Sequence, residues 1–207
     1  MAWVNEPELA GDISEALSHA SEADRLVGND AWTSVCELYF KALNRFWNAL
    51  AAHQGEPGRA DTPSFVVLLQ SLSTQDQRAL LTGEELSSLV GLTPEVMDHS
   101  VLKARGYRPG HQIAAALFKE ATERHRSLRR ALAETTGREG SENLNRVLKR
   151  LAEFLFVIRS NIAHGEKIPY TPDFEKAKRD EEVSRLAVPV LQLIVRALHT
   201  RADAGAR

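Results

Sequence analysis

Apolar residues recur along most of this chain at the three- and four-residue spacing of an α-helix, and strand-like alternation is missing. One stripe steps by four and three residues in turn, and it consists of Trp32, Cys36, Tyr39, Leu43, Phe46 and Leu50. A second stripe begins after Ser141 and consists of Leu144, Val147, Leu148, Leu151, Leu155, Ile158 and Ile162. Because each stripe forms an apolar helix face that must be buried against another helix, the pattern predicts an all-α bundle.

Polar signals between the stripes predict where other helices begin and end. Residues 12–15 (DISE) have the cap-plus-glutamate pattern that opens a helix, and this first helix should fade at Gly28. Two further long helices are expected over residues 111–135 and 173–200. Pro189 should bend or divide the second of these, because proline cannot donate a backbone hydrogen bond.

The middle of the chain has a less regular pattern. The turn-rich stretch QGEPGRADTP follows the first stripe, and an apolar segment then covers residues 65–72. Short helices should begin near Thr74 and Thr82. We expect a single domain in which residues 54–110 form an insertion or lid of short helices between two halves built from long helices.

Composition excludes several classes of protein. No run of 18 or more apolar residues is present, so no membrane span is expected, and the N-terminus lacks the basic and apolar regions of a signal peptide. The single cysteine, Cys36, cannot form a disulfide within the chain. The histidines are scattered without metal-ligand spacing, and no glycine-rich nucleotide-binding motif occurs. We therefore expect a cytoplasmic, soluble protein without a metal or a cofactor.

Positive charge gathers in one part of the chain, although the net charge is only −2. Residues 101–150 hold 12 Lys and Arg against 5 Asp and Glu. Two groups of these basic residues stand out. The first is a run on the predicted long helix, and it consists of Arg124, Arg126, Arg129 and Arg130. The second lies in a predicted loop, and it consists of Lys103, Arg105 and Arg108. Both groups would favour an anionic ligand, and an ordinary solvated surface has the same composition.

The second stripe runs into the polar sequence IRSNIAHG, in which Arg159 and His164 stand five residues apart before Gly165. On a regular helix that spacing corresponds to roughly 140° around the axis and roughly 7.5 Å along it, so the two side chains do not share a face. The length of the arginine stem, or a helix break near Gly165, would bring them together. The negative end of the helix dipole favours the protonated form of a histidine at a helix C-terminus. A phosphate between that histidine and the guanidinium would relieve the repulsion between the two positive charges. These residues are therefore either ordinary helix caps or a small cationic site.

Residues 158–165 resemble the R-x(4–6)-H signature of the HEPN superfamily, which also sits at the end of an apolar helix in a four-helix bundle. The aromatic-rich helix expected over residues 32–50 is similar to an early core helix of that fold. The resemblance implies a HEPN-like antiparallel helical bundle. Active members of the family are metal-independent ribonucleases that work as dimers, with both Arg/His motifs facing one cleft. Many of them belong to toxin–antitoxin or phage-defence systems.

The resemblance also implies roles for individual residues. Arg159 would bind the scissile phosphate, and His164 would transfer protons while the ribose 2′-hydroxyl attacks. Ser160 and Asn161 would be supporting residues, although the family most often has Asn, Asp or His where Ser160 stands. The implied partners are an RNA substrate, a second copy of the chain and a cognate antitoxin or other partner protein.

Two interpretations of the basic residues and of the Arg/His pair follow. In the first, the basic run and the basic loop hold RNA phosphates beside a cleft formed by a homodimer. The alternative is a non-catalytic helical interaction module, or a nucleotide- or anion-binding module, in which Arg159 and His164 cap the helix or bind an anion.

Overall fold

The computed structural model describes residues 7–29, 31–55, 62–92, 112–135, 141–165 and 174–204 of the 207-residue chain. Within these ranges all regular structure is helical, which confirms the all-α class predicted from the apolar periodicity. The elements are the 3₁₀-helix η2 (Pro7–Leu9) and the α-helices α1 (Ala10–Leu26), α2 (Trp32–His53), α3 (Thr62–Gln70), α4 (Thr74–Thr82), α5 (Glu84–Val90), α8 (Gln112–Thr135), α9 (Ser141–Gly165) and α10 (Phe174–Ala204). None of these helices combines the length and the apolar character needed to cross a membrane.

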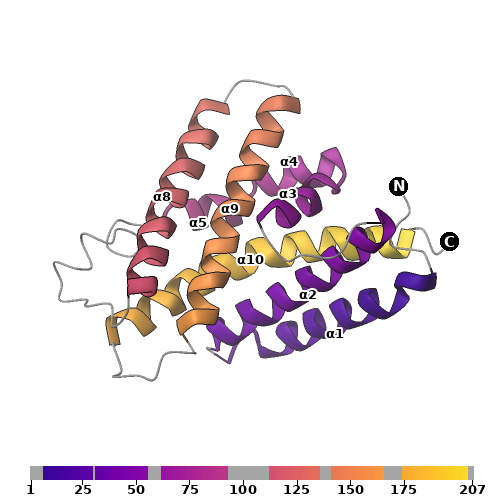
Figure 1. The fold of residues 1–207 in the computed structure, drawn as a ribbon, viewed down its shortest axis with the longest axis horizontal. Coiled ribbons are helices and arrows are strands. Elements are labelled where there is room, and N and C mark those ends of the chain that lie inside the picture. The colour runs from indigo at the N-terminus through magenta and orange to yellow at the C-terminus, as the bar shows by residue number, and fades with distance from the viewer. Residues whose placement is uncertain are drawn as a thin grey trace.

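Two antiparallel helix pairs and the long α10 make up the framework (Figure 1). α1 and α2 lie side by side, and α8 and α9 form a second hairpin that stands across them (Figure 1). α10 runs along α2, while α3 packs against α9, α5 against α10, and α4 against both. The arrangement agrees with the predicted all-α bundle, and its relation to the HEPN fold stays a prediction.

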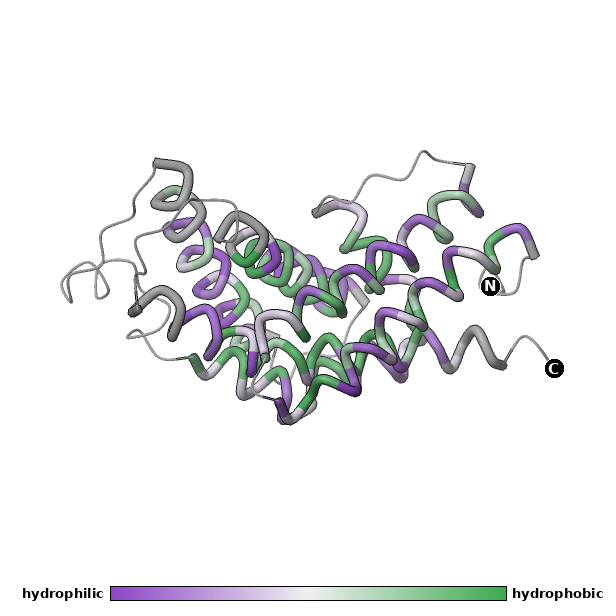
Figure 2. The backbone as a smooth tube through the Cα atoms, turned by 90° about the horizontal axis from the view of Figure 1, so that it is seen from below, coloured by the Kyte–Doolittle hydropathy of each residue, from purple (hydrophilic) through white to green (hydrophobic). Residues whose placement is uncertain are grey.

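α2 is the central helix of the core, and its burial follows the stripe expected from the sequence. Cys36, Leu43 and Phe46 are fully buried because α1, α3, α9 and α10 all pack against this helix. Trp32, at the start of the stripe, is only partly buried. The apolar positions of the helices gather along their mutual contacts (Figure 2). Each fully buried large apolar side chain contributes about 1.5–3 kcal/mol to folding.

The start of α1 differs from the prediction. The helix begins at Ala10, so the capping role predicted for Asp12 is wrong. Leu9 occupies the N-cap position without a side-chain hydrogen bond, and Asp12 lies in the first helical turn. Asp12 and Glu15 instead pair with Arg45 of α2, with nitrogen–oxygen distances of 3.3 and 2.6 Å. The positive end of the helix dipole stabilises an acidic residue in the first turn. The two ion pairs with Arg45 also join α1 to α2.

The sequence predicted that Pro189 would bend or divide α10; the helix continues through Pro189, so the division does not occur. A proline inside a helix removes one backbone hydrogen bond and costs about 3 kcal/mol. The residues on both sides of it are at most 1% exposed, and they are Ala187, Val188, Val190 and Leu191. Their burial in the core offsets that cost and keeps the helix continuous.

The short helices of the middle segment belong to the packed core. Phe65 of α3 is 1% exposed, and its ring centroid lies 6.0 Å from that of Phe40 and 6.4 Å from that of Phe156. α4 and α5 begin within two residues of the starts predicted from the sequence. The described helices of residues 54–110 thus contact α2, α9 and α10 directly, and the assignment of this segment as an insertion or lid stays a prediction.

His125 connects α8 to the C-terminal end of α5. The residue is 4% exposed, and its Nε2 lies 2.9 Å from the carbonyl oxygen of Val90, to which a neutral imidazole can donate. The ring of Phe154 from α9 packs against it, with 5.4 Å between centroids. Burial lowers the pKa of His125, and the neighbouring Arg129 and Arg126 lower it further against the raising effect of the Val90 hydrogen bond.

Protonation of His125 should therefore destabilise the fold. The unfolded chain binds this proton near pH 6.5, and the folded chain binds it only at a lower pH. Because the unfolded state then carries more protons, the free energy of unfolding should fall as the pH drops below about 6.5. Urea unfolding at about pH 7.5 and about pH 5.5 measures the loss. His125→Gln, whose amide can still donate to Val90, should lose less stability than the wild type, and an equal loss would contradict the assignment.

Candidate functional site

The candidate site lies in the last turns of α9. The helix continues as far as Gly165, so no helix break separates Arg159 from His164. Regular helix geometry therefore keeps the two residues roughly 140° apart around the axis and roughly 7.5 Å apart along it. Within one chain only the reach of the arginine stem can close that gap. The side chains of His164 and Asn161 lie outside the described residues.

Arg159 is partly buried, and its guanidinium lies over the ring of Phe156, with 5.7 Å between Cζ and the ring centroid. Within the described part of the chain, no carboxylate oxygen lies within 4.0 Å of its nitrogens. Burial lowers the pKa of Arg159, although the guanidinium remains charged near neutral pH. A cation that is partly removed from water without a counter-charge is a favourable position for an anion.

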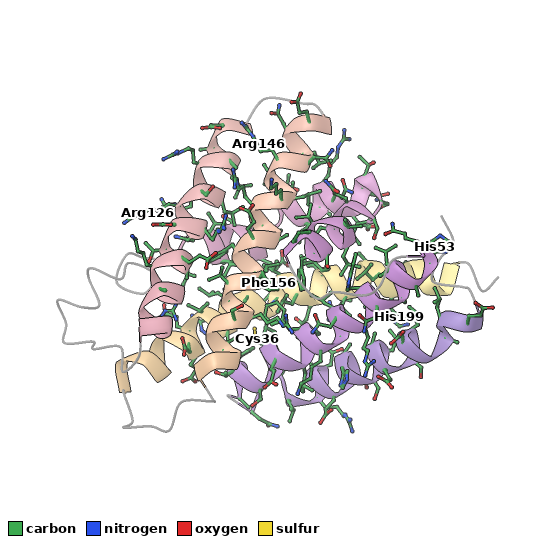
Figure 3. All side chains as sticks on the ribbon, viewed as in Figure 1. Cys36, His53, Arg126, Arg146, Phe156 and His199 are labelled. Carbon is green, nitrogen blue, oxygen red and sulfur yellow. The ribbon has the colours of Figure 1, made fainter. Side chains whose placement is uncertain are left out.

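A series of aromatic rings supports the position of Arg159. Phe156 contacts Phe65 of α3 edge to face, and Phe65 contacts Phe40 of α2. Phe156 lies on the stretch of α9 that crosses α10 (Figure 3). Because Phe156 precedes Arg159 by one turn, the stacking directs the arginine stem toward the N-terminal side of α9, whereas His164 lies on the C-terminal side.

Ser160, the supporting residue next to Arg159, is engaged by the helix itself. Its hydroxyl donates to the carbonyl oxygen of Phe156 at 3.0 Å. A serine hydroxyl carries one proton, so in this state Ser160 can only accept a further hydrogen bond from a ligand. The residue could not bind a phosphate oxygen without giving up its bond to the backbone.

The residues of the basic run predicted on α8 differ in how far they are exposed. Arg124 forms ion pairs with Glu120 at 3.3 Å and with Glu153 of α9 at 3.0 Å. Glu153 is 7% exposed and also accepts a hydrogen bond from Arg150 at 2.8 Å. Arg124 therefore helps to satisfy a buried carboxylate between α8 and α9, and its guanidinium is not available to a ligand unless that ion pair breaks.

The other members of the run are exposed on α8, and they are Arg126, Arg129 and Arg130. Arg126 lies on the side of α8 that faces away from α9 (Figure 3). The residues of the basic loop lie outside the described residues, and they are Lys103, Arg105 and Arg108. Of the seven basic candidates, three are thus placed on one exposed helix surface.

Two other kinds of chemistry find no support in the part of the chain that the structure describes. No group of three or more His, Cys, Asp or Glu side chains there could hold a metal ion. Cys36 is fully buried, and burial raises the pKa of its thiol to about 12, so a reactive thiolate is absent near neutral pH. The residue is a small core side chain, as the apolar stripe predicted.

Comparison of the chain with protein-family models, with curated proteins and with solved structures found no match. The resemblance to the HEPN superfamily therefore depends on the spacing of Arg159 and His164 and on their position at the end of an apolar helix.

Proposed function

We propose that this protein is a metal-independent endoribonuclease of HEPN type that works as a homodimer. The observation that best supports the proposal is the state of Arg159, a partly buried guanidinium with no described carboxylate within 4.0 Å. The planar fork of a guanidinium matches two oxygens of a phosphate, so an RNA phosphodiester is a suitable partner for it. His164 stands near the end of the same helix and supplies an imidazole, a group that can both accept and donate a proton.

In the proposed reaction the 2′-oxygen of a ribose attacks the adjacent phosphorus, and the bond from phosphorus to the 5′-oxygen of the next nucleotide breaks. The 2′-hydroxyl releases a proton and the leaving 5′-oxygen takes one up, and His164 serves these transfers. Arg159 stabilises the negative charge that grows on the non-bridging phosphate oxygens. The products are a 2′,3′-cyclic phosphate and a free 5′-hydroxyl, and the reaction consumes no water.

A homodimer would overcome the separation of Arg159 and His164 within one chain. Arg159 and His164 of one chain lie on different sides of α9, and the arginine stem is directed away from the C-terminal end. A second copy would bring another Arg/His pair to the same cleft. One imidazole could then accept the 2′-proton while the other, protonated, gives a proton to the 5′-oxygen. A role as a toxin or phage-defence effector with a cognate antitoxin is proposed on the resemblance alone.

The exposed arginines of α8 should add salt-dependent affinity for RNA. Replacing Arg129 and Arg130 by alanine should weaken binding and lower the slope of log K against log salt by about 0.7 for each phosphate that the variant no longer neutralises. Fluorescence anisotropy with a single-stranded RNA at several salt concentrations measures the slope. Arg25→Ala, at an exposed arginine in the last turn of α1, is the matched control. Equal slopes in all three proteins would exclude binding of RNA phosphates at α8.

The proposed function is tested by incubating the purified protein with total RNA and with transfer RNA in the presence of a chelator. We expect cleavage that leaves 5′-hydroxyl ends, which a polynucleotide kinase labels without prior phosphatase treatment. A requirement for a divalent metal, or products with 5′-phosphates, would contradict the mechanism. Binding of RNA or nucleotide without cleavage would favour the non-catalytic anion-binding module instead.

A further inference from the structure

A groove separate from α9 lies where α1, α2 and α10 meet. Its volume is about 300 Å³, which is at the lower end of the range for small-molecule sites. Leu17 and Ala20 of α1 and Val195 of α10 supply apolar walls. Tyr39 of α2, which is 1% exposed, lies against the groove with its hydroxyl group. The groove therefore has an apolar wall and a polar lining, and the polar residues are Ser21, Asp24, Tyr39, Gln192, Arg196 and His199.

Asp24 is the best-fixed polar group of this groove. One of its oxygens, Oδ1, accepts hydrogen bonds from the Tyr39 hydroxyl at 2.5 Å and from the Gln192 amide at 3.0 Å. Burial and the Asp24 hydrogen bond raise the pKa of Tyr39, so its hydroxyl stays protonated and remains a donor. Within the described residues no donor reaches Oδ2 of Asp24. That oxygen can accept hydrogen bonds from a ligand.

Arg196 of α10 lines the same groove and brings the opposite charge. Its charge lowers the pKa of Tyr39 whereas that of Asp24 raises it, so both groups lie near the Tyr39 hydroxyl. No ion pair joins Asp24 to Arg196, and neither forms an ion pair with any other described residue. Asp24 and Arg196 thus both line the groove as exposed residues of opposite charge that form no ion pair with each other.

We propose that this groove binds a small zwitterion of the amino-acid type with an apolar side chain. Its ammonium group would donate to Oδ2 of Asp24, and its carboxylate would accept from the guanidinium of Arg196. Its side chain would lie against Leu17, Ala20 and Val195. Asp24 and Arg196 are both exposed, and a ligand with only one charge could pair with only one of them, so we expect the zwitterion to bind more tightly than a singly charged analogue. This binding is independent of Arg159 and of the proposed cleavage of RNA.

Chemical-shift titration of the ¹⁵N-labelled full chain tests the proposal, with L-leucine as the probe. Leucinamide lacks the carboxylate, and N-acetyl-leucine lacks the ammonium group. We expect leucine to shift resonances from α1, α2 and α10 around the groove and each analogue to bind about tenfold or more weakly, since it cannot form one of the two charge-assisted bonds. If leucine shifts no resonance at the groove, or if either analogue binds as tightly as leucine, the proposal is wrong.

Two substitutions assign the charges to their residues. Arg196→Gln should weaken leucine binding by about tenfold and abolish the preference for leucine over leucinamide. Asp24→Asn should abolish the preference for leucine over N-acetyl-leucine, and its amide oxygen can still accept from Tyr39 and Gln192. A merely structural change would not remove these preferences.

Arg185→Gln, at an exposed arginine of α10 that does not line the groove, is the matched control and should bind leucine like the wild type. An equal loss of affinity in Arg185→Gln and in Arg196→Gln would overturn the assignment. So would a retained preference in both of the groove variants.

Discussion

Replacing His164 by alanine is expected to lower the rate of RNA cleavage by roughly 100- to 10,000-fold, because the transition state would lose its proton-transfer group. Single-turnover cleavage with the protein in excess over RNA measures the chemical step alone. The fold should be kept, because the apolar stripe of the sequence ends at Ile162, before His164. The free energy of unfolding should therefore change by only about 0.5 kcal/mol.

The matched control is His53→Ala, since His53 is exposed at the C-terminal end of α2, away from the end of α9 (Figure 3). It should cleave RNA like the wild type. Unchanged cleavage in His164→Ala would remove His164 from the mechanism. An equal loss in both variants would indicate a nuclease that is not this protein or a general effect of the substitutions.

Replacing Arg159 distinguishes the proposed enzyme from a protein in which this residue is only structural, because the two predict different effects on RNA cleavage and on stability. In the proposed enzyme, the guanidinium has no described counter-charge, and its only described partner is the ring of Phe156. Its removal should then reduce cleavage strongly and stability little. In the alternative, Arg159 has only a structural role, and its removal would lower stability without affecting RNA.

The sequence predicted the long helices well because their signal extends over many turns. The stripes of α2 and α9 repeat the same spacing several times, so a single exception such as the partly buried Trp32 or Leu144 does not change the assignment. The end of α1 was also predictable from the glycine at position 28. Gly28 has a φ of +107°, a conformation that residues with a side chain rarely adopt. These are properties of local sequence.

Helix boundaries were less predictable where local preference competes with packing. Asp12 has the chemistry of a cap, yet it lies in the first turn of α1, where it pairs with Arg45 of α2. Pro189 has the chemistry of a helix breaker, yet buried neighbours on both sides keep α10 continuous. In both cases the deciding partner lies on another helix, and a single sequence does not reveal which helix that is.

The candidate site was predictable only where its residues are close in sequence. Arg159 and His164 stand out because they interrupt an apolar helix within five residues. The ring of Phe156 below Arg159 could have been noticed from the one-turn spacing between them. By contrast, Asp24 and Gln192 are 168 residues apart, so their shared place in the second groove is a consequence of topology. Likewise, only the fold shows that Arg124 is paired with Glu153.

Replacing Phe65 by alanine is expected to lower the free energy of unfolding by about 3–5 kcal/mol. The side chain is 1% exposed and touches the rings of Phe40 and Phe156, so the substitution would leave a cavity between three helices. Urea unfolding followed by circular dichroism measures the loss. Val66→Ala, at the partly buried neighbour in α3, is the matched control and should cost about 1 kcal/mol.

The helices that lose stability in Phe65→Ala would also show whether residues 54–110 form a lid. If α3 belonged to a lid that opens by itself, Phe65→Ala would speed amide exchange in α3 and leave the protection of α2 and α9 unchanged. We expect protection to fall in α2 and α9 as well, because Phe65 links the two helices through Phe40 and Phe156. Since Arg159 stacks on Phe156, the same variant should weaken the proposed phosphate site without replacing Arg159 or His164, the two proposed catalytic residues.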